Sequence, residues 1–121
     1  MNDTLTDWEA EGLSRDVLEG SLVGSLLVDP TGHRWLLQEV AATMFHHPGL
    51  ASLWSGMQHL HREGLPTDAV LVQRRCPAEW KLIPLAMESV PTSFHAEHYA
   101  TELKSLNVEQ PEPQAIPDLP L

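Results

Sequence analysis

Apolar and polar positions follow a helical period along most of the chain, and the first strong segment covers about residues 15–28. Residues 20–28 carry no charge, and small residues recur among them every four positions. A helix without a solvated face is typical of the centre of a fold. Small residues let a neighbouring backbone approach, so we expect close packing at Gly24. Asp29 and the proline after it should end the helix in a turn.

Glu19 lies within the apolar half of this predicted helix. Two interpretations are open for it. The carboxylate either caps a neighbouring helix or joins a buried ion pair, or it is solvated in the first turn of the helix. Residues 1–14, which precede the helix, have the composition of a polar arm with Trp8 as the one large anchor.

Two further helices are predicted before residue 65. One spans about 33–43, and Phe45 closes that segment. The other has the clearest pattern, because its apolar residues recur at i, i+3, i+4 and i+7. It should begin near Pro48 and end at Gly64, which suits a left-handed C-cap. The apolar faces of the two helices are formed by Trp35, Leu36, Leu37 and Val40, and by Leu50, Leu53, Trp54, Met57 and Leu60.

Prolines separate the remaining helices. Pro66 precedes a fourth helix, which Thr67 or Asp68 can cap. Pro84 is expected to start a fifth helix, because proline breaks a helix interior. Pro91 interrupts the chain before a sixth helix. These helices are predicted over about 69–75, 85–89 and 94–106, the last one capped by Thr92 or Ser93.

Residues 107–121 contain four prolines, so they are expected to be disordered or to adopt polyproline II conformation. No segment shows the sustained alternation of a β-strand. We therefore predict an all-α fold with a polar arm at 1–14, a helical domain at 15–106 and a proline-rich tail at 107–121. The helical domain should consist of a compact head and a C-terminal helical hairpin.

The chain has 121 residues, with 17 acidic side chains against 7 Lys and Arg and a net charge of −10. Such a chain repels a phosphate backbone, so direct nucleic-acid binding is not expected. The single cysteine, Cys76, excludes an intramolecular disulfide, and the adjacent Arg74 and Arg75 could lower its pKa. Neither a signal peptide nor a long apolar run is visible, so we expect a cytoplasmic protein without membrane contact.

The sequence lacks the motifs of common catalytic sites. It has no GxxxxGK[ST] phosphate loop, no GxSxG and no HExxH, so we predict no catalytic residue and no cofactor. His95 and His98 can share a helix face near Glu97, but a zinc site needs three or four converging ligands, so no metal site is predicted. Trp54 is expected in the core, whereas Trp8 or Trp80 could be an exposed anchor for a partner.

Taken in order, these features resemble the N-terminal domain of the DnaB-like replicative helicases, over about residues 15–106. That family typically begins with an acidic residue and an apolar stretch that ends in Asp, and it has a Phe after the second helix. A large apolar pair followed by Gly-x-Pro-x-Asp comes next, and then a Val-Pro with a later Tyr-Ala. The matching residues here are Glu19, Val23-Gly24, Asp29, Phe45, Leu53-Trp54, Gly64, Pro66, Asp68, Val90-Pro91 and Tyr99-Ala100. The chain departs from the family at Leu50-Ala51, where His-Arg is usual, in a shortened segment 74–88, and in the absence of the linker and ATPase domain from these 121 residues.

The resemblance implies a non-enzymatic module of DNA replication that contacts the helicase, the primase or itself. In the family the last two helices form a hairpin that pairs subunits, so the candidate interface here is Leu85, Met87, Phe94, Tyr99 and Leu103. A variant of this interpretation is a phage or mobile-element protein that blocks a host replication interface. The alternatives are an unrelated small all-α adaptor and a small enzyme that uses His and Glu.

Overall fold

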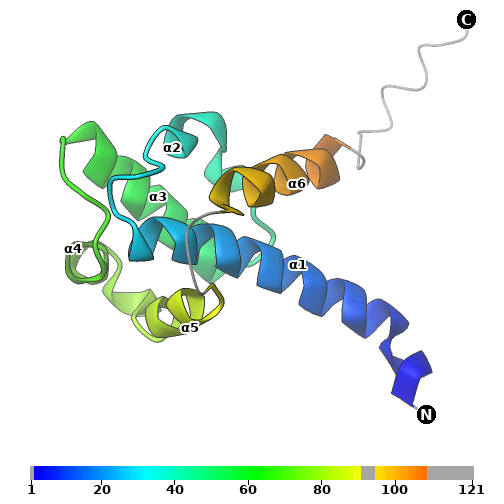
Figure 1. Ribbon diagram of the computed structural model, residues 1–121. Coiled ribbons are helices and arrows are strands. Elements are labelled where there is room, and N and C mark those ends of the chain that lie inside the picture. Colours follow the sequence, from blue (N-terminus) through cyan, green and yellow to red (C-terminus); the bar gives the residue numbers. More distant parts are fainter. Residues whose placement is uncertain (1, 91–94, 109–121) are drawn as a thin grey trace, which may run out of the picture.

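The computed structural model describes residues 2–90 and 95–108, which form helices joined by turns (Figure 1). No strand occurs in these two ranges, and the all-α class is confirmed. The elements are α1 (Asn2–Val28), α2 (Leu36–Glu39), the 3-10 helix η1 (Ala42–Met44), α3 (Pro48–Arg62), α4 (Ala69–Arg75), the 3-10 helix η2 (Pro77–Glu79), α5 (Leu82–Glu88) and α6 (Ala96–Val108).

Helix α1 is the element around which the others are arranged. Helices α5 and α6 both make their main contacts with α1, and α3 packs against it as well. Figure 1 shows α6 on one side of α1 and α5 on the other, while the first turns of α1 extend away from the other helices. The core therefore surrounds the second half of α1, where Leu22, Val23, Leu26 and Leu27 are buried.

Small residues on α1 allow its close contact with α5. A Cβ atom added at Gly24 would overlap the carbonyl oxygen of Ala86 and lie 2.7 Å from its carbonyl carbon. The buried hydroxyl of Ser25 is satisfied within the helix, because it donates to the Ser21 carbonyl at 2.8 Å. The structure thus places a neighbouring backbone at Gly24, as the small-residue spacing predicts.

Helix α1 begins at Asn2, so the predicted start near residue 15 is wrong, and the polar residues 2–14 belong to the same helix. The sequence explains the longer helix. No proline occurs before Pro30, so nothing in residues 2–14 interrupts the backbone hydrogen bonds of a helix. A polar composition indicates little apolar surface to bury, but it does not prevent helix formation.

The second predicted helix is also different, because α2 covers only Leu36–Glu39 and Val40 adopts an extended conformation. The indole Nε1 of Trp54 donates to the Val40 carbonyl at 2.8 Å, and Gln58 Nε2 donates to the same oxygen at 3.1 Å. With that carbonyl bound to α3, the helix cannot continue through it. Trp35, expected on the buried face, lies in the turn before α2 and is 45% exposed.

Helix α3 matches its prediction at both ends. It begins at Pro48, and after Arg62 the chain turns at Gly64, which has a φ of +77°. The amide of Leu65 donates to the Leu60 carbonyl at 2.9 Å, as in a Schellman motif. Only glycine adopts this backbone conformation without a steric penalty, so the C-cap could be read from the sequence.

The segment between α3 and α4 is held in place by hydrogen bonds of the Thr67 and Asp68 side chains. The buried hydroxyl of Thr67 donates to the Leu26 carbonyl at 2.7 Å, which ties this segment to the end of α1. Asp68 caps α4 by accepting the Leu71 amide at 2.9 Å. Helix α4 spans Ala69–Arg75, and its predicted bounds are confirmed.

Helix α5 begins at Leu82, earlier than predicted, with Pro84 in its first turn. The missing N–H of a proline costs little there, because first-turn amides have no partner within the helix. Helix α6 spans Ala96–Val108, which ends two residues beyond its predicted end. Pro91, Thr92, Ser93 and Phe94 lie outside the described residues.

The two C-terminal helices do not stand outside the head. Each packs chiefly against α1, and Leu103 of α6 is completely buried in the core. A pair of helices standing alone would expose Leu103 to water, and packing against α1 covers it here. The length of α1 explains the difference, because one long central helix offers a face to each of them.

The Gly24 contact can be tested by comparing two glycines of the same helix. Gly24→Ala should destabilise the fold by about 1–3 kcal/mol, because the new methyl group forces α5 away from α1. Gly20→Ala is the matched control, since its Cβ would lie 3.6 Å from the Ser89 hydroxyl oxygen, an ordinary contact. That change should be neutral or stabilising by up to about 1 kcal/mol. Urea unfolding followed by circular dichroism measures both, and equal effects would contradict the tight α1–α5 packing.

Candidate interaction surface

Glu19 connects α1 to the start of α3. Its side chain is fully buried, and it accepts the backbone amides of His46 at 2.8 Å and His47 at 3.0 Å. The guanidinium of Arg15, one turn earlier on α1, donates to the same carboxylate at 3.0 Å and to the Met44 carbonyl at 3.1 Å. Of the two interpretations of Glu19, the buried one is right, because this carboxylate both binds amides near a helix start and forms an ion pair.

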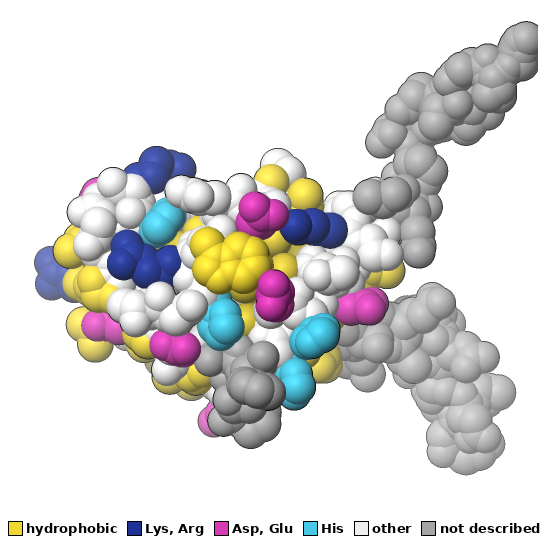
Figure 2. Space-filling view, turned by 45° about the horizontal axis from the view of Figure 1, so that its top comes forward, with side chains coloured by type: hydrophobic (Ala, Val, Ile, Leu, Met, Phe, Trp, Pro, Cys, Tyr) yellow, Lys and Arg dark blue, Asp and Glu magenta, His cyan; other side chains and the backbone are white. Residues whose placement is uncertain are grey.

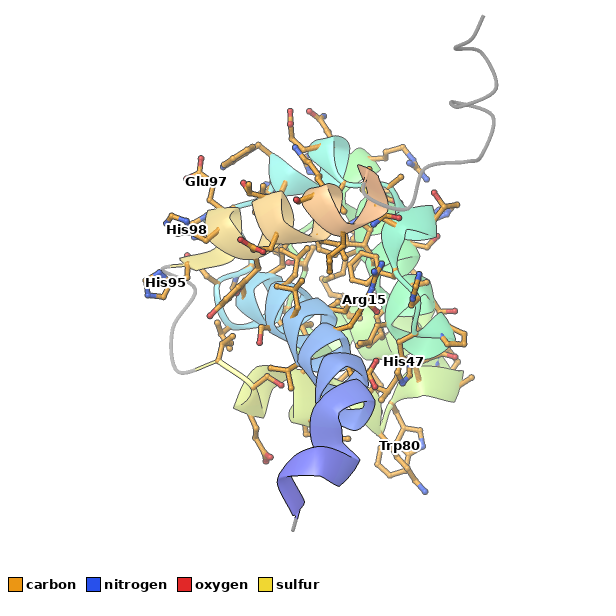
Figure 3. All side chains as sticks on the ribbon, turned by 90° about the vertical axis from the view of Figure 1, so that its right-hand side faces the viewer. Arg15, His47, Trp80, His95, Glu97 and His98 are labelled. Atoms are coloured by element: carbon orange, nitrogen blue, oxygen red, sulfur yellow. The ribbon has the colours of Figure 1, made fainter. Side chains whose placement is uncertain are left out.

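His47 has a structural role that the sequence did not indicate. Its Nδ1 accepts the amides of Gly49 at 3.1 Å and Leu50 at 3.3 Å, so the imidazole caps α3. Figure 3 shows His47 and Arg15 close together beside α1, where Glu19 binds both. Histidine is not among the preferred N-cap residues, and the only local signal was the proline that follows it.

Most of the remaining motif residues are structural. Phe45 packs on Trp54 with ring centroids 5.2 Å apart, and both side chains are buried. Asp29 accepts the Gly32 amide at 3.1 Å in the turn after α1. Pro66 lies between the Gly64 turn and the cap of α4 and is partly buried. These residues hold the fold and leave the surface to other side chains.

The most exposed aromatic side chain of the described surface lies between η2 and α5. Trp80 is 52% exposed, and Leu85, in the next helix, is 59% exposed. The ammonium of Lys81 lies 5.7 Å from the centroid of the Trp80 ring. Figure 3 shows Trp80 pointing away from the body of the molecule. Of the two tryptophans considered as anchors, Trp80 is therefore exposed, and the structure does not describe the side chain of Trp8.

A hollow of about 500 Å³ lies beside this segment, between α3 and the η2 turn. Gly56 brings the two walls together, since a Cβ there would overlap the sulfur of Cys76. The lining residues are Ser52, Ser55, Gly56, His59, Arg75, Cys76, Pro77, Ala78 and Glu79. Its lining combines the buried thiol of Cys76 with polar side chains from α3 and η2.

Cys76 is not an activated thiol. Burial raises the pKa of the Cys76 thiol, the nearby Glu79 carboxylate raises it further, and Arg75 opposes both effects. The expected lowering by the neighbouring arginines is therefore wrong. Arg75 donates to Glu63 at 2.9 Å, and that hydrogen bond lowers the pKa of the Glu63 carboxyl. The Sγ of Cys76 contacts the Ser52 carbonyl at 3.5 Å.

The residues predicted as an interface are distributed over different environments. Leu103 is buried, Leu85 is exposed, and Met87 and Tyr99 are partly buried against the core. Phe94 lies outside the described residues. Whether any of them contacts a partner stays a prediction.

The histidines near the start of α6 lie at the surface. His95 and His98 have ring centroids 5.8 Å apart, and Figure 3 shows both beside Glu97 at one edge of the molecule. Within 2–90 and 95–108, no group of three or more His, Cys, Asp and Glu side chains could hold a metal ion. In the same described ranges, no helix is both long and apolar enough to cross a membrane.

These observations define a small all-α domain. Its polar network around Glu19 is structural, and the exposed side chains of Trp80 and Leu85 lie beside a hollow. The family model for the DnaB-like helicase N terminal domain matches residues 15–105, more than half of the chain. The chain belongs to this family, and the matched domain is a non-catalytic helical one. The alternative that the likeness is accidental is therefore wrong. Neither the comparison with curated proteins nor that with solved structures gives a match.

The Glu19 network predicts that replacing the Glu19 carboxylate lowers the stability of the protein far more than replacing the Glu39 carboxylate. Glu19→Gln should destabilise the protein by about 3–5 kcal/mol, because it removes the negative charge that compensates the nearly buried Arg15. Glu39→Gln is the control, since the Glu39–Lys104 pair is solvent-exposed and should contribute at most about 1 kcal/mol. Chemical unfolding of both variants measures the difference. A Glu19→Gln protein as stable as the control would show that the carboxylate is replaceable by an amide.

The raised pKa of Cys76 predicts slow alkylation by iodoacetamide. The folded protein holds the thiol proton more tightly than an exposed cysteine does, so the rate should reach half its maximum at a higher pH than in the urea-unfolded chain. A pH series of labelling rates, read by mass spectrometry for folded and unfolded chains, checks this. A folded chain that reacts at the lower pH would show an activated thiolate.

Proposed function

We propose that this chain is a non-enzymatic protein-interaction module of DNA replication, which acts in the cytoplasm by binding a replicative helicase, a primase or a second copy of itself. The observation that carries the proposal is the family match over residues 15–105. The net charge of −10 favours a protein partner over a phosphate backbone.

The exposed surface around Trp80 supports a protein partner. Tryptophan is enriched at the centres of protein interfaces, where it buries a large rigid surface. Trp80 has an adjacent cation in Lys81 and an exposed aliphatic side chain in Leu85, so it offers apolar area with a positive charge beside it. A partner segment with apolar and acidic side chains would be complementary to it.

Self-association is the second form of the proposal, and it rests on Leu85. Leu85 is the predicted interface residue with the largest described exposure, whereas Leu103 cannot take part without unfolding α6 from the core. A two-fold dimer would place the same apolar surface of two copies together. Sedimentation at micromolar concentration distinguishes this form from a complex with another protein.

Binding to the helicase and primase of the same cell tests the proposal. Trp80→Ala should weaken the complex about tenfold or more, the effect of losing an interface hot spot. Trp35→Ala is the matched control, because Trp35 is exposed to a similar degree in the turn before α2 and should change affinity by less than about twofold. Biolayer interferometry with each immobilised partner measures the affinities. Absence of both complexes, together with a monomer in sedimentation, would contradict the proposal.

A further inference from the structure

The surface formed by Trp80, Lys81 and Leu85 has a cation beside its exposed apolar side chains, although the protein as a whole is acidic. Arg74 and Arg75 lie in the last turn of α4, and Lys81 follows Trp80, so three of the seven Lys and Arg residues lie within eight positions. In the space-filling view of Figure 2, Lys and Arg side chains are scattered over the face that carries α2 and α6. The side of the hollow next to Trp80 consists of Pro77, Ala78 and Glu79.

The sequence after α6 has a pattern that fits such a surface. A polyproline II helix has three residues per turn, so residues three apart share a face. Applied to residues 109–121, this period gives two mainly apolar faces, each with one glutamine, and one edge that carries three acidic residues. The apolar residues of the two faces are Pro113, Ile116 and Leu119, and Pro111, Pro117 and Pro120; the acidic residues of the third are Glu109, Glu112 and Asp118.

We propose that residues 109–121 of the chain bind in polyproline II conformation across Trp80 and the adjacent hollow of the same molecule. Proline-rich segments bind exposed aromatic rings in this way, because their conformation costs little entropy. In this arrangement the apolar face with Ile116 and Leu119 packs on the Trp80 ring, and the acidic edge lies toward Lys81. The inference goes beyond the proposed function and does not depend on a replication partner.

The length of residues 109–121 and their covalent attachment to the domain favour them as the segment that binds at Trp80. The described structure ends at Val108, and thirteen residues in polyproline II conformation extend about 40 Å, the scale of the domain itself. A segment tethered to its site has an effective concentration in the millimolar range, so a weak contact is sufficient for occupancy. A bound tail would cover the surface that we propose for partners, and a partner would then have to displace it.

The test uses the full chain labelled with 5-fluorotryptophan, in which fluorine NMR reports each tryptophan separately. The Trp80 and Trp35 resonances are assigned from Trp80→Phe and Trp35→Phe. In the double variant Ile116→Ser, Leu119→Ser, the Trp80 resonance should shift. The line broadening that a dissolved paramagnetic compound causes at this resonance should rise roughly twofold, because the tail no longer shields the ring from solvent. The Trp35 resonance, from a ring of similar exposure, should not change.

Two further variants separate docking from general effects. Gln114→Ser changes the tail without removing an aliphatic side chain and should leave both resonances unchanged. Lys81→Glu should reproduce the exposure of Trp80, and Lys81→Glu combined with Asp118→Lys should restore the wild-type signal. A Trp80 signal that is insensitive to the tail variants, or that moves together with Trp35, would overturn the inference. An effect that disappears on tenfold dilution would assign the contact to a second copy and would equally overturn it.

Discussion

The buried carboxylate of Glu19 joins α1 to the start of α3, and this burial is tolerable only because both of its oxygens have donors. Burying an unpaired carboxylate costs several kcal/mol, so Arg15 and the amides of His46 and His47 must be placed together. The length of α1 matters here. Because the helix begins at Asn2, Arg15 lies in its interior, where its position one turn before Glu19 is set by the helix itself.

The same loop then determines how α3 begins. With its amide bound to Glu19, His47 is positioned to cap α3 through Nδ1. Helix α3 in turn fixes the chain before it, since Trp54 and Gln58 bind the Val40 carbonyl and stop α2. One buried charge on α1 is thus linked, through a short series of hydrogen bonds, to the conformation of residues 36–50.

The opposite side of α1 depends on close packing. At Gly24 the backbone of α5 approaches α1 more closely than any side chain would allow, while α6 covers another side with Leu103 buried. With α5 and α6 both packed on α1, Leu103 is no longer available for pairing subunits. Trp80 and Leu85 stay exposed where α5 begins, next to the hollow and to Lys81. The surface available to a partner is therefore a consequence of how the central helix is covered.

The sequence alone determined the elements whose signals are local. The period of α3, the left-handed turn at Gly64 and the Asp68 cap of α4 depend on hydrogen bonds between residues at most five positions apart, so they could be predicted with nearly correct bounds. The family resemblance was likewise present in the order of short motifs, and the family match confirms it. The small-residue spacing indicated the approach of a backbone at Gly24, although not which helix would supply it.

Only the tertiary structure decided the features that depend on distant partners. The carbonyl of Val40 accepts hydrogen bonds from the side chains of Trp54 and Gln58, which lie 14 and 18 residues later, and Val40 is not helical. The carboxylate of Glu19 accepts backbone amides 27 and 28 residues away. Neither effect leaves a local pattern, because it arises from a donor and an acceptor that meet only when the chain has folded. The exposure of Trp35 and the burial of Leu103 have the same origin. Both Trp35 and Leu103 stand in the sequence like apolar residues of a helix. The packing around α1 determines that Trp35 is exposed to solvent and that Leu103 is buried.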